Sequence, residues 1–168
     1  MPKPPSPKRR CNRSAAIRLH LLAIGRLRRG PLYELQALYA GRIVPPVTIT
    51  ELEEKRRLPP AELKQREAEL ILAALPAGAR LVALDERGTL WTSRQFADRL
   101  AVWRDGATAA LAFAIGGADG LGQEVIQRAE AVLSLGAMTW PHLLARSLLL
   151  EQLYRAQQIL AGHPYHRD

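Results

Sequence analysis

Hydrophobic residues along the chain fall into short, mostly apolar runs that alternate with longer stretches in which apolar residues recur three and four positions apart. The short runs predict strands and lie at 17–24 (IRLHLLAI), 80–84 (RLVAL) and 109–115 (AALAFAI). The longer stretches predict helices, which begin at Pro31, at Pro60 and at Thr92 or Ser93. In the third helix, Phe96, Leu100 and Trp103 share the face expected to be buried. Strands that alternate with helices favour an α/β fold with a mostly parallel sheet and helices on both faces.

Local composition assigns the less regular segments. Residues 44–49 (VPPVTI) carry two prolines and predict a second strand at an irregular sheet edge, whereas residues 51–57 (ELEEKRR) mix charges without a period and predict a solvated loop. Residues 85–88 (DERG) predict the turn after the third strand. The remaining pattern predicts, in order, a helix, a short strand and a long helix, at 123–132, 133–138 and 141–161.

The composition is that of a folded protein with an excess of positive charge. The 168 residues are 48% hydrophobic, and 24 Lys and Arg against 16 Asp and Glu give a formal net charge of +8. The length favours a single domain, over residues 15–168, and the charge would attract a phosphate backbone, although many basic proteins bind no nucleic acid. No apolar run approaches the roughly 20 residues that cross a bilayer, so we expect no membrane segment.

A basic, proline-rich arm over residues 1–14 precedes this domain. It begins MPKPPSPKRRCNR, lacks the apolar stretch of a secretory signal and predicts disorder. The arm is either an RNA-attracting tail or an extension without consequence. It holds Cys11, the single cysteine, which cannot form an internal disulfide, and no Cys/His spacing resembles a zinc site. We therefore expect a reducing, cytoplasmic environment and no metal.

Three arginines follow the first strand directly. Arg26, Arg28 and Arg29 lie in the sequence RLRRG, at the C-terminal end of that strand. Open α/β sheets place their ligands at this end of their strands. The position favours contact with phosphate over a merely solvated loop.

Two turns in the last third of the chain are candidate ligand sites. The run at 109–115 delivers IGGADG, whose Gly116, Gly117 and Gly120 allow a ligand to approach bare backbone N–H groups. This is neither a GxGxxG nor a P-loop sequence, and a tight strand-to-helix turn explains the same glycines. The second turn, residues 136–141 (GAMTWP), is small and apolar and suits an adenosine-like or thioether ligand. The alternative is an ordinary connection with Trp140 in the core.

The long C-terminal helix and the tail after it carry the polar candidates. His142 and Arg146 are four apart and share one helix face, whereas Tyr154 lies about 80° further round and Arg155 nearly opposite Arg146. The spacing of Glu151 and Arg155 also fits an exposed ion pair. In the tail, Tyr165, His166 and Arg167 can hydrogen-bond, stack on bases and move protons, although a C-terminus is usually frayed.

These motifs together resemble one known family. The glycine turn IGGADG, the stretch LSLGAMTWPHLLARSLLLEQLYRA and the ending HPYHRD are similar to the RlmH family of SPOUT methyltransferases, over about residues 80–168. That family methylates N3 of a pseudouridine in 23S ribosomal RNA. The resemblance implies a trefoil knot in the C-terminal part of the fold, S-adenosylmethionine as methyl donor and a homodimer with the active site at the subunit interface. The assembled ribosome would be the substrate.

The resemblance also implies roles for individual residues. The implied cofactor pocket consists of Leu84, Gly116, Gly117, Gly120, Gly136, Ala137, Met138, Thr139, Trp140 and Pro141. The implied catalytic residues are His142, Tyr154, Tyr165 and His166, and the implied RNA contacts are Arg146, Arg155 and Arg167. Gly136 and Trp140 depart from the family pattern, and Trp140 would narrow an adenine slot. Residues 1–14 and 31–75 fit the family poorly.

The chemistry of the reaction requires a proton acceptor, because N3 of a pseudouridine carries a proton at neutral pH. Our hypothesis gives this proton to His142 or His166, with Tyr154 and Tyr165 as hydrogen-bonding or stacking groups. A tyrosine could be the base only if an arginine lowered its pKa. The alternatives are methylation of a ribose 2'-oxygen or of transfer RNA, and a ribosome-associated RNA-binding protein without catalysis.

Overall fold

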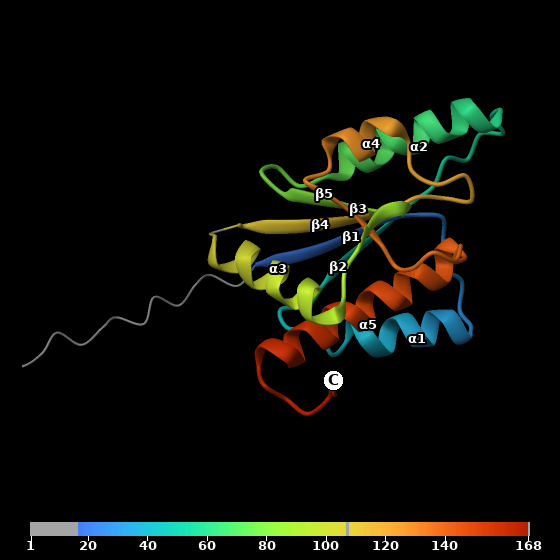
Figure 1. Ribbon diagram of the computed structural model, residues 1–168. Coiled ribbons are helices and arrows are strands. Elements are labelled where there is room, and N and C mark those ends of the chain that lie inside the picture. Colours follow the sequence, from blue (N-terminus) through green and yellow to red (C-terminus); the bar gives the residue numbers. More distant parts are fainter. Residues whose placement is uncertain (1–16, 107, 168) are drawn as a thin grey trace, which may run out of the picture.

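Strands and helices alternate along the whole described chain (Figure 1). The structure, a computed structural model, describes residues 17–106 and 108–167, so the predicted arm over residues 1–14, with Cys11, lies outside it. The strands are β1 (Arg18–Ile24), β2 (Thr48–Leu52), β3 (Arg80–Leu90), β4 (Ala110–Ile115) and β5 (Ala131–Ser134). The helices are α1 (Pro31–Ala40), α2 (Pro60–Ala74), α3 (Ser93–Asp105), α4 (Gln123–Arg128) and α5 (His142–Leu160).

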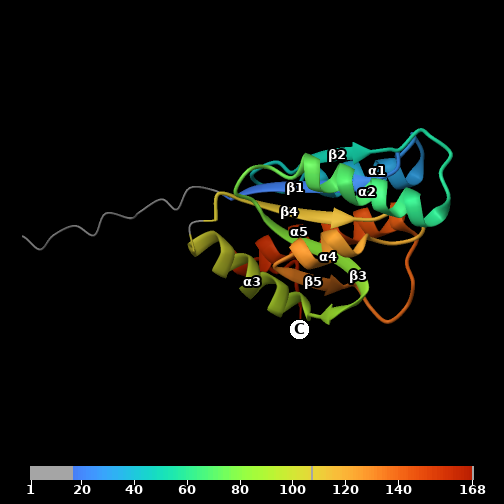
Figure 2. The same ribbon diagram turned by 90° about the horizontal axis from the view of Figure 1, so that it is seen from above.

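The strands form one sheet in the order β2-β1-β4-β3-β5, and every neighbouring pair is parallel. Helices α2 and α4 cover one face, and α1, α3 and α5 cover the other (Figure 1). Figure 2 shows the strands side by side and pointing the same way, so their C-terminal ends meet at one edge. The predicted α/β fold class is confirmed, and the trefoil knot stays an implication of the resemblance.

The central strand β4 explains why the two faces hold different helices. All six of its residues are buried. Its alternation places Leu111, Phe113 and Ile115 in the cluster under α3 and α5, and three alanines in the cluster under α2 and α4. Large side chains therefore fill the space below the long helix α5, and small ones let α2 and α4 approach the sheet closely.

Helix α3 forms where its sequence signals predict. Thr92 is the N-cap: its hydroxyl accepts a hydrogen bond from the Gln95 backbone N–H at 3.1 Å, and the Gln95 side chain accepts one from the Thr92 N–H at 2.8 Å. The predicted inner residues Phe96, Leu100 and Trp103 are all buried. Local capping and periodicity were sufficient here because both act within one turn of helix.

Four predicted boundaries are wrong, the first being the helix predicted at 123–132, since α4 ends at Arg128. Strand β2 starts at Thr48, after the prolines that cannot donate to a ladder, and it includes Glu51, which the sequence assigned to a loop. Strand β3 continues through residues 85–88 with a register shift, and Gly88 packs so closely on β5 that an added Cβ would lie 2.7 Å from the backbone of Leu133. Strand β5 lies at Ala131–Ser134 because it pairs from Val82↔Ala131 onwards.

Candidate functional site

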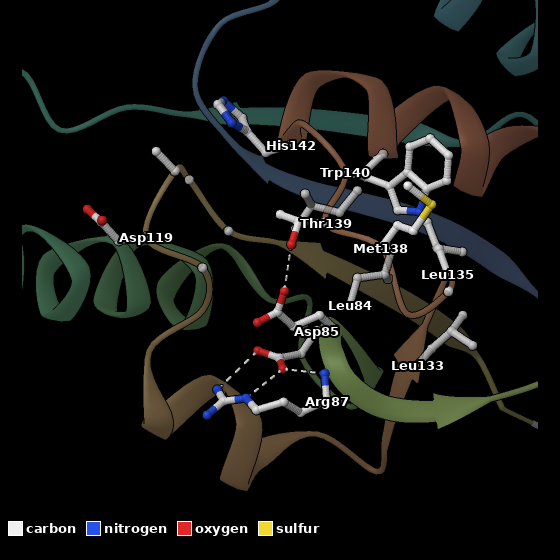
Figure 3. A pocket seen from close by; sticks show the side chains of 18 of the residues that line it. Leu84, Asp85, Arg87, Asp119, Leu133, Leu135, Met138, Thr139, Trp140 and His142 are labelled. Carbon is white, nitrogen blue, oxygen red and sulfur yellow. Dashed lines mark hydrogen bonds and ion pairs between the residues drawn. The ribbon is translucent and has the colours of Figure 1, made fainter.

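A cavity of about 410 Å³ lies at the C-terminal edge of the sheet (Figure 3). Its walls are the segments that follow the C-terminal ends of β4 and β5, the residues after Leu84 in β3, and the first turn of α5. Parallel strands bring the ends of β3, β4 and β5 together at one edge, although the lining residues lie up to 81 positions apart, from Lys64 of α2 to Ala145 of α5. The volume is in the range of small-molecule sites, roughly 300–1,000 Å³.

Most residues of the implied cofactor pocket line this cavity. They are Leu84, Gly116, Gly117, Gly120, Gly136, Met138, Thr139 and Trp140. Ala137 and Pro141 belong to the same turn but do not line the cavity. The structure thus brings the two suspected turns together around one space, and their binding of a cofactor stays a prediction.

The first turn is held in shape by contacts between its own backbone atoms. The Gly120 N–H donates to the Gly117 carbonyl at 3.1 Å. A Cβ added at Gly116 would lie 2.5 Å from the carbonyl carbon of Gly120, a distance that real Cβ atoms do not show. Glycine at position 116 is therefore required by close approach of backbone to backbone.

Glu67 of α2 supports this turn and was missed by the sequence prediction. Its carboxylate oxygens lie 3.0 and 3.1 Å from the position of a Cβ built on Gly117, and the Gly117 N–H donates to the carboxylate. Burial, followed by the nearby Asp119, raises the pKa of Glu67. The sequence marked α2 as a helix that packs on the sheet, but nothing in it indicated which turn Glu67 would meet.

The second turn places two large apolar side chains at the rim of the cavity. Ser134 fixes the start of the turn, because its hydroxyl donates to the Gly136 carbonyl at 2.9 Å and accepts from the Gly136 N–H at 3.2 Å. Met138 and Trp140 lie side by side in this turn (Figure 3), and they are 74% and 41% exposed. The alternative that Trp140 lies in the core is therefore wrong.

Charged residues of β3 and the glycine turn line the cavity, and the sequence prediction missed them. Asp85 accepts hydrogen bonds from the Arg87 backbone N–H at 2.9 Å and from its guanidinium at 3.1 Å, which lower the pKa of Asp85 (Figure 3). Glu86 accepts a hydrogen bond from the Thr139 hydroxyl at 3.1 Å, and Asp119 also lines the cavity. Their position one or two residues after Leu84 and Gly117, which the resemblance placed in the cofactor pocket, could have indicated them.

His142, the first residue of α5, also lines the cavity. Its Nε2 atom lies 3.3 Å from the position of a Cβ built on Gly25, so the ring packs against the end of β1. Burial, with a smaller contribution from the Arg146 charge, lowers the pKa of His142. The imidazole is consequently neutral at pH 7 and able to accept a proton.

Arg146, predicted as an RNA contact, is enclosed on all sides by groups of its own chain. Its side chain is fully buried, forms an ion pair with Glu51 at 2.8 Å and donates to the carbonyls of Ile24 and Gly25, each at 2.7 Å. These bonds tie α5 to the C-terminal end of β1. The guanidinium has no exposed surface, and the predicted RNA contact of Arg146 stays a prediction.

The other polar candidates form a cluster at the far end of α5. The Tyr154 and Tyr165 rings meet edge to face at 4.8 Å, and the Arg155 guanidinium lies 4.8 Å from the Tyr165 ring. Arg155 also pairs with Glu151 at 2.9 Å, as their spacing predicted, and lies 3.4 Å from a ring nitrogen of His166. We call these residues, Glu151, Tyr154, Arg155, Tyr165 and His166, the tail cluster.

The surroundings of Tyr165 favour its protonated form. Burial raises the pKa of Tyr165 to about 12, together with hydrogen bonds to Tyr39 and Glu151. Its hydroxyl donates to Glu151 at 3.0 Å. An arginine does lie over the ring, but the condition set for a tyrosine base, a lowered pKa, is not met. The tail itself is not frayed here, since these contacts hold it on α5.

The cavity and the tail cluster of one chain are separate. Glu151 lies nine positions after His142, which corresponds to about 14 Å along a helix axis. Tyr154, Arg155 and the tail residues lie further on, and Arg167 is exposed. Of the seven polar candidates, the structure therefore brings only His142 to the cavity.

Two classes of site are not found among residues 17–106 and 108–167. No group of three or more His, Cys, Asp or Glu side chains there is arranged to hold a metal ion. None of the helices in that part of the chain is long and apolar enough to cross a membrane.

Comparison with known proteins adds the family. Residues 17–166 match the family described as "Predicted SPOUT methyltransferase". The chain is 57% identical to the ribosomal RNA large subunit methyltransferase H of Rhodospirillum centenum over 151 residues, which cover 90% of this chain and 99% of that protein. It is 54% identical over the same length to the protein of that name from Paramagnetospirillum magneticum, again over 90% and 99% of the two chains.

The fold is also similar to that of a solved protein. A probable methylase family protein from Haemophilus influenzae superposes with a TM-score of 0.56, over 89% of this chain and 70% of the other. Only 12% of the residues are identical. This likeness concerns the fold alone.

Proposed function

Because the chain belongs to the SPOUT methyltransferase family and, within it, to the RlmH proteins, we propose that it methylates N3 of a pseudouridine in 23S ribosomal RNA. The observation that carries the proposal is the cavity in which the two turns meet, since its lining includes eight of the ten residues implied by the resemblance. Such a substrate, as rRNA or as the assembled ribosome, would place the protein in the cytoplasm.

The lining of the cavity fits S-adenosylmethionine. Leu84, Leu133 and Leu135 offer an apolar wall for a purine, and the glycine turn exposes backbone to within contact distance of a ligand. Asp119 offers a negative charge to the cationic end of the molecule. When bound, the cofactor would supply a methyl group on a positively charged sulfonium.

The residues of this chain would align the reacting nitrogen and remove its proton. His142 is the candidate base, because it lines the cavity and its lowered pKa keeps it neutral at pH 7. Arg146 is the positioning residue, since its bonds to Ile24 and Gly25 fix α5 against β1 where His142 begins the helix. Met138 and Trp140 at the rim would exclude water once RNA covers them.

We propose further that the active form is a homodimer in which the tail of one copy completes the cavity of the other. The tail cluster is too far along α5 to serve the cavity of its own chain, by about 14 Å or more. A two-fold axis that brings the two helices together would bridge this distance. Exposed apolar side chains on α1, Tyr33 and Leu38, are available to such a contact.

The test combines binding with the identity of the product. Calorimetry should detect binding of S-adenosylmethionine to the purified protein, and labelled methyl groups should enter ribosomes or large subunits from cells that lack the protein. Mass spectrometry should then find the methyl group on N3 of a pseudouridine. Transfer to a ribose oxygen or to transfer RNA would contradict the proposed target, and binding of RNA without binding of the cofactor would contradict the enzymatic function.

A further inference from the structure

Two basic loops occupy the half of the sheet edge that the cavity leaves free. The first is residues 25–30, after β1, and the second is residues 53–59, after β2. Both leave the same edge of the sheet as the cavity and then diverge towards α1 and α2 (Figure 1). Their exposed cationic side chains are Arg26, Arg28, Arg29, Lys55, Arg56 and Arg57. We call these six residues the basic edge.

Specific contacts hold the two loops beside each other. The Gly25 N–H donates to the Leu52 carbonyl at 2.7 Å and extends the β1–β2 ladder beyond the strands. The Leu27 N–H donates to the Glu51 carboxylate at 2.9 Å. That carboxylate is also the partner of the buried Arg146, so the loops are joined to the helix that starts at His142. The basic edge is therefore fixed relative to the cavity.

The charges of the basic edge are largely unneutralised. Glu53 and Glu54 are the two acidic side chains within these loops. Glu54 bonds Arg56 and Arg66, and Glu53 lies 3.9 Å from Arg26. Among the described residues, Arg28, Arg29, Lys55 and Arg57 have no ion-pair or hydrogen-bond partner. Exposed like charges held together raise the energy of the free protein, and a polyanion would remove that cost.

The basic edge also borders the place where a nucleotide would react. Strand β1 pairs directly with β4, which leads into the glycine turn, and the Cγ2 of Ile24 lies 3.2 Å from the position of a Cβ built on Gly117. His142 packs on Gly25, the first residue of the first loop. A strand of RNA with one base in the cavity would continue over these loops with its phosphates.

From this placement we propose that the basic edge is the surface that binds the RNA backbone next to the modified nucleotide. The inference rests on the proposed function for the identity of the RNA. The surface recognises phosphate and not base sequence, because its cations lie on exposed loops without a groove for base edges.

Charge removal tests the proposal in the full-length protein. The variants are Arg28→Gln with Arg29→Gln, and Lys55→Gln with Arg57→Gln. The matched control, Arg18→Gln with Arg128→Gln, removes the same charge from exposed positions at the opposite edge of the sheet. Circular dichroism and calorimetric binding of S-adenosylmethionine verify that each variant keeps its fold and its cofactor site.

We expect each loop variant to raise the KM for ribosomes about tenfold at roughly 0.1 M salt, with kcat unchanged. The dependence of log KM on log salt should become shallower by about 0.7–0.9 for each phosphate that the variant no longer binds. The control should leave both quantities as in the wild type. Loop variants that behave like the control would overturn the proposal.

Two further probes separate this inference from the proposed function. A hairpin RNA of arbitrary sequence should bind the wild type more tightly than the loop variants, whether or not methyl transfer is observed. If the wild type shows no methylation and this difference in RNA affinity persists, the proposed function is wrong and the assignment of the basic edge as an RNA-binding surface is supported. If the loop variants lose binding only to anionic phosphatidylserine vesicles and keep their RNA affinity, the partner is a membrane surface and the proposal is wrong.

Discussion

The two ends of helix α5 carry the same kinds of side chain in opposite surroundings. At the first turn, His142 and Arg146 meet glycine turns, a cavity and the end of β1. From Glu151 onwards, the tail cluster packs aromatic rings and an arginine against the helix, away from the residues that line the cavity. One end has space for a small molecule and a single candidate base. The other end has polar groups and lies outside that space. In the proposed homodimer, the cavity end of one copy would be completed by the tail end of the other.

The largest effect is expected from replacing His142, the candidate proton acceptor at the cavity end of α5. His142→Asn should lower the methylation rate by about 10²–10⁴, the usual contribution of a positioned base. Because burial lowers the pKa of His142, wild-type kcat should rise through an inflection below pH 6.5 and be level at pH 7. The variant should lose this inflection.

His20 is the matched control for that experiment, since burial also lowers its pKa but it lies within β1, away from the cavity. His20→Gln should keep the inflection. A pH profile that survives in His142→Asn would show that the base is elsewhere.

Replacing each of the two arginines of α5 shows how much the contacts at each end of the helix contribute to the free energy of unfolding. Arg146→Met removes a fully buried cation that bonds Glu51 and two backbone carbonyls, and it should lower the free energy of unfolding by about 3 kcal/mol. Arg155→Met breaks a partly exposed pair and should cost less than about 1 kcal/mol. Chemical denaturation measures both, and equal losses would refute the structural role assigned to Arg146.

A substitution in the glycine turn should lower the affinity for the cofactor and leave the tail cluster unchanged. Gly116→Ala places a methyl group against the backbone of Gly120, which costs about 1–3 kcal/mol and should weaken S-adenosylmethionine binding roughly tenfold to a hundredfold. Gly41→Ala, at the end of α1 with an ordinary backbone φ of −69°, should leave the affinity unchanged. Calorimetry measures the affinity of both variants. Unchanged binding in Gly116→Ala would show that the cofactor does not bind at this turn.

The smallest effect is expected at Glu67, behind that turn. Glu67→Gln keeps an oxygen for the Gly117 N–H and should change cofactor affinity less than about threefold. Because the folded pKa of Glu67 is raised, the folded state binds more protons than the unfolded state above pH 4.5. The wild type should therefore lose stability relative to Glu67→Gln as pH rises through that raised pKa. Parallel stability curves from pH 4 to 8 would show that Glu67 ionises as freely in the fold as in water.

The sequence predicted elements whose determinants are local. The helix with Phe96, Leu100 and Trp103, its Thr92 cap and the buried strand β4 all follow from periodicity and capping within a few positions. The two ligand turns are recognisable from their small residues. That they line one cavity follows from the parallel sheet, in which strand ends meet.

Contacts between distant segments could not be predicted. The partner of Arg146, Glu51, lies 95 positions away in a segment that reads as a loop, because its charges gave no strand period. The raised pKa of Tyr165 depends on the tail folding back onto Glu151, 14 positions earlier. The exposure of Trp140 also depends on tertiary packing, since its sequence neighbours fit a buried position equally well.

The proposed shared active site is tested most directly by mixing two impaired chains, assayed at an S-adenosylmethionine concentration that fills the wild-type cavity but not that of Gly116→Ala. Gly116→Ala damages the cavity, and Tyr165→Ala with His166→Ala removes the tail. Co-expressed in equal amounts, the two chains should form about half mixed dimers, each with one intact cavity facing one intact tail, and recover about a quarter of wild-type methylation. If the mixture stays as inactive as either variant alone, each chain works by itself and the proposed exchange of tails is wrong.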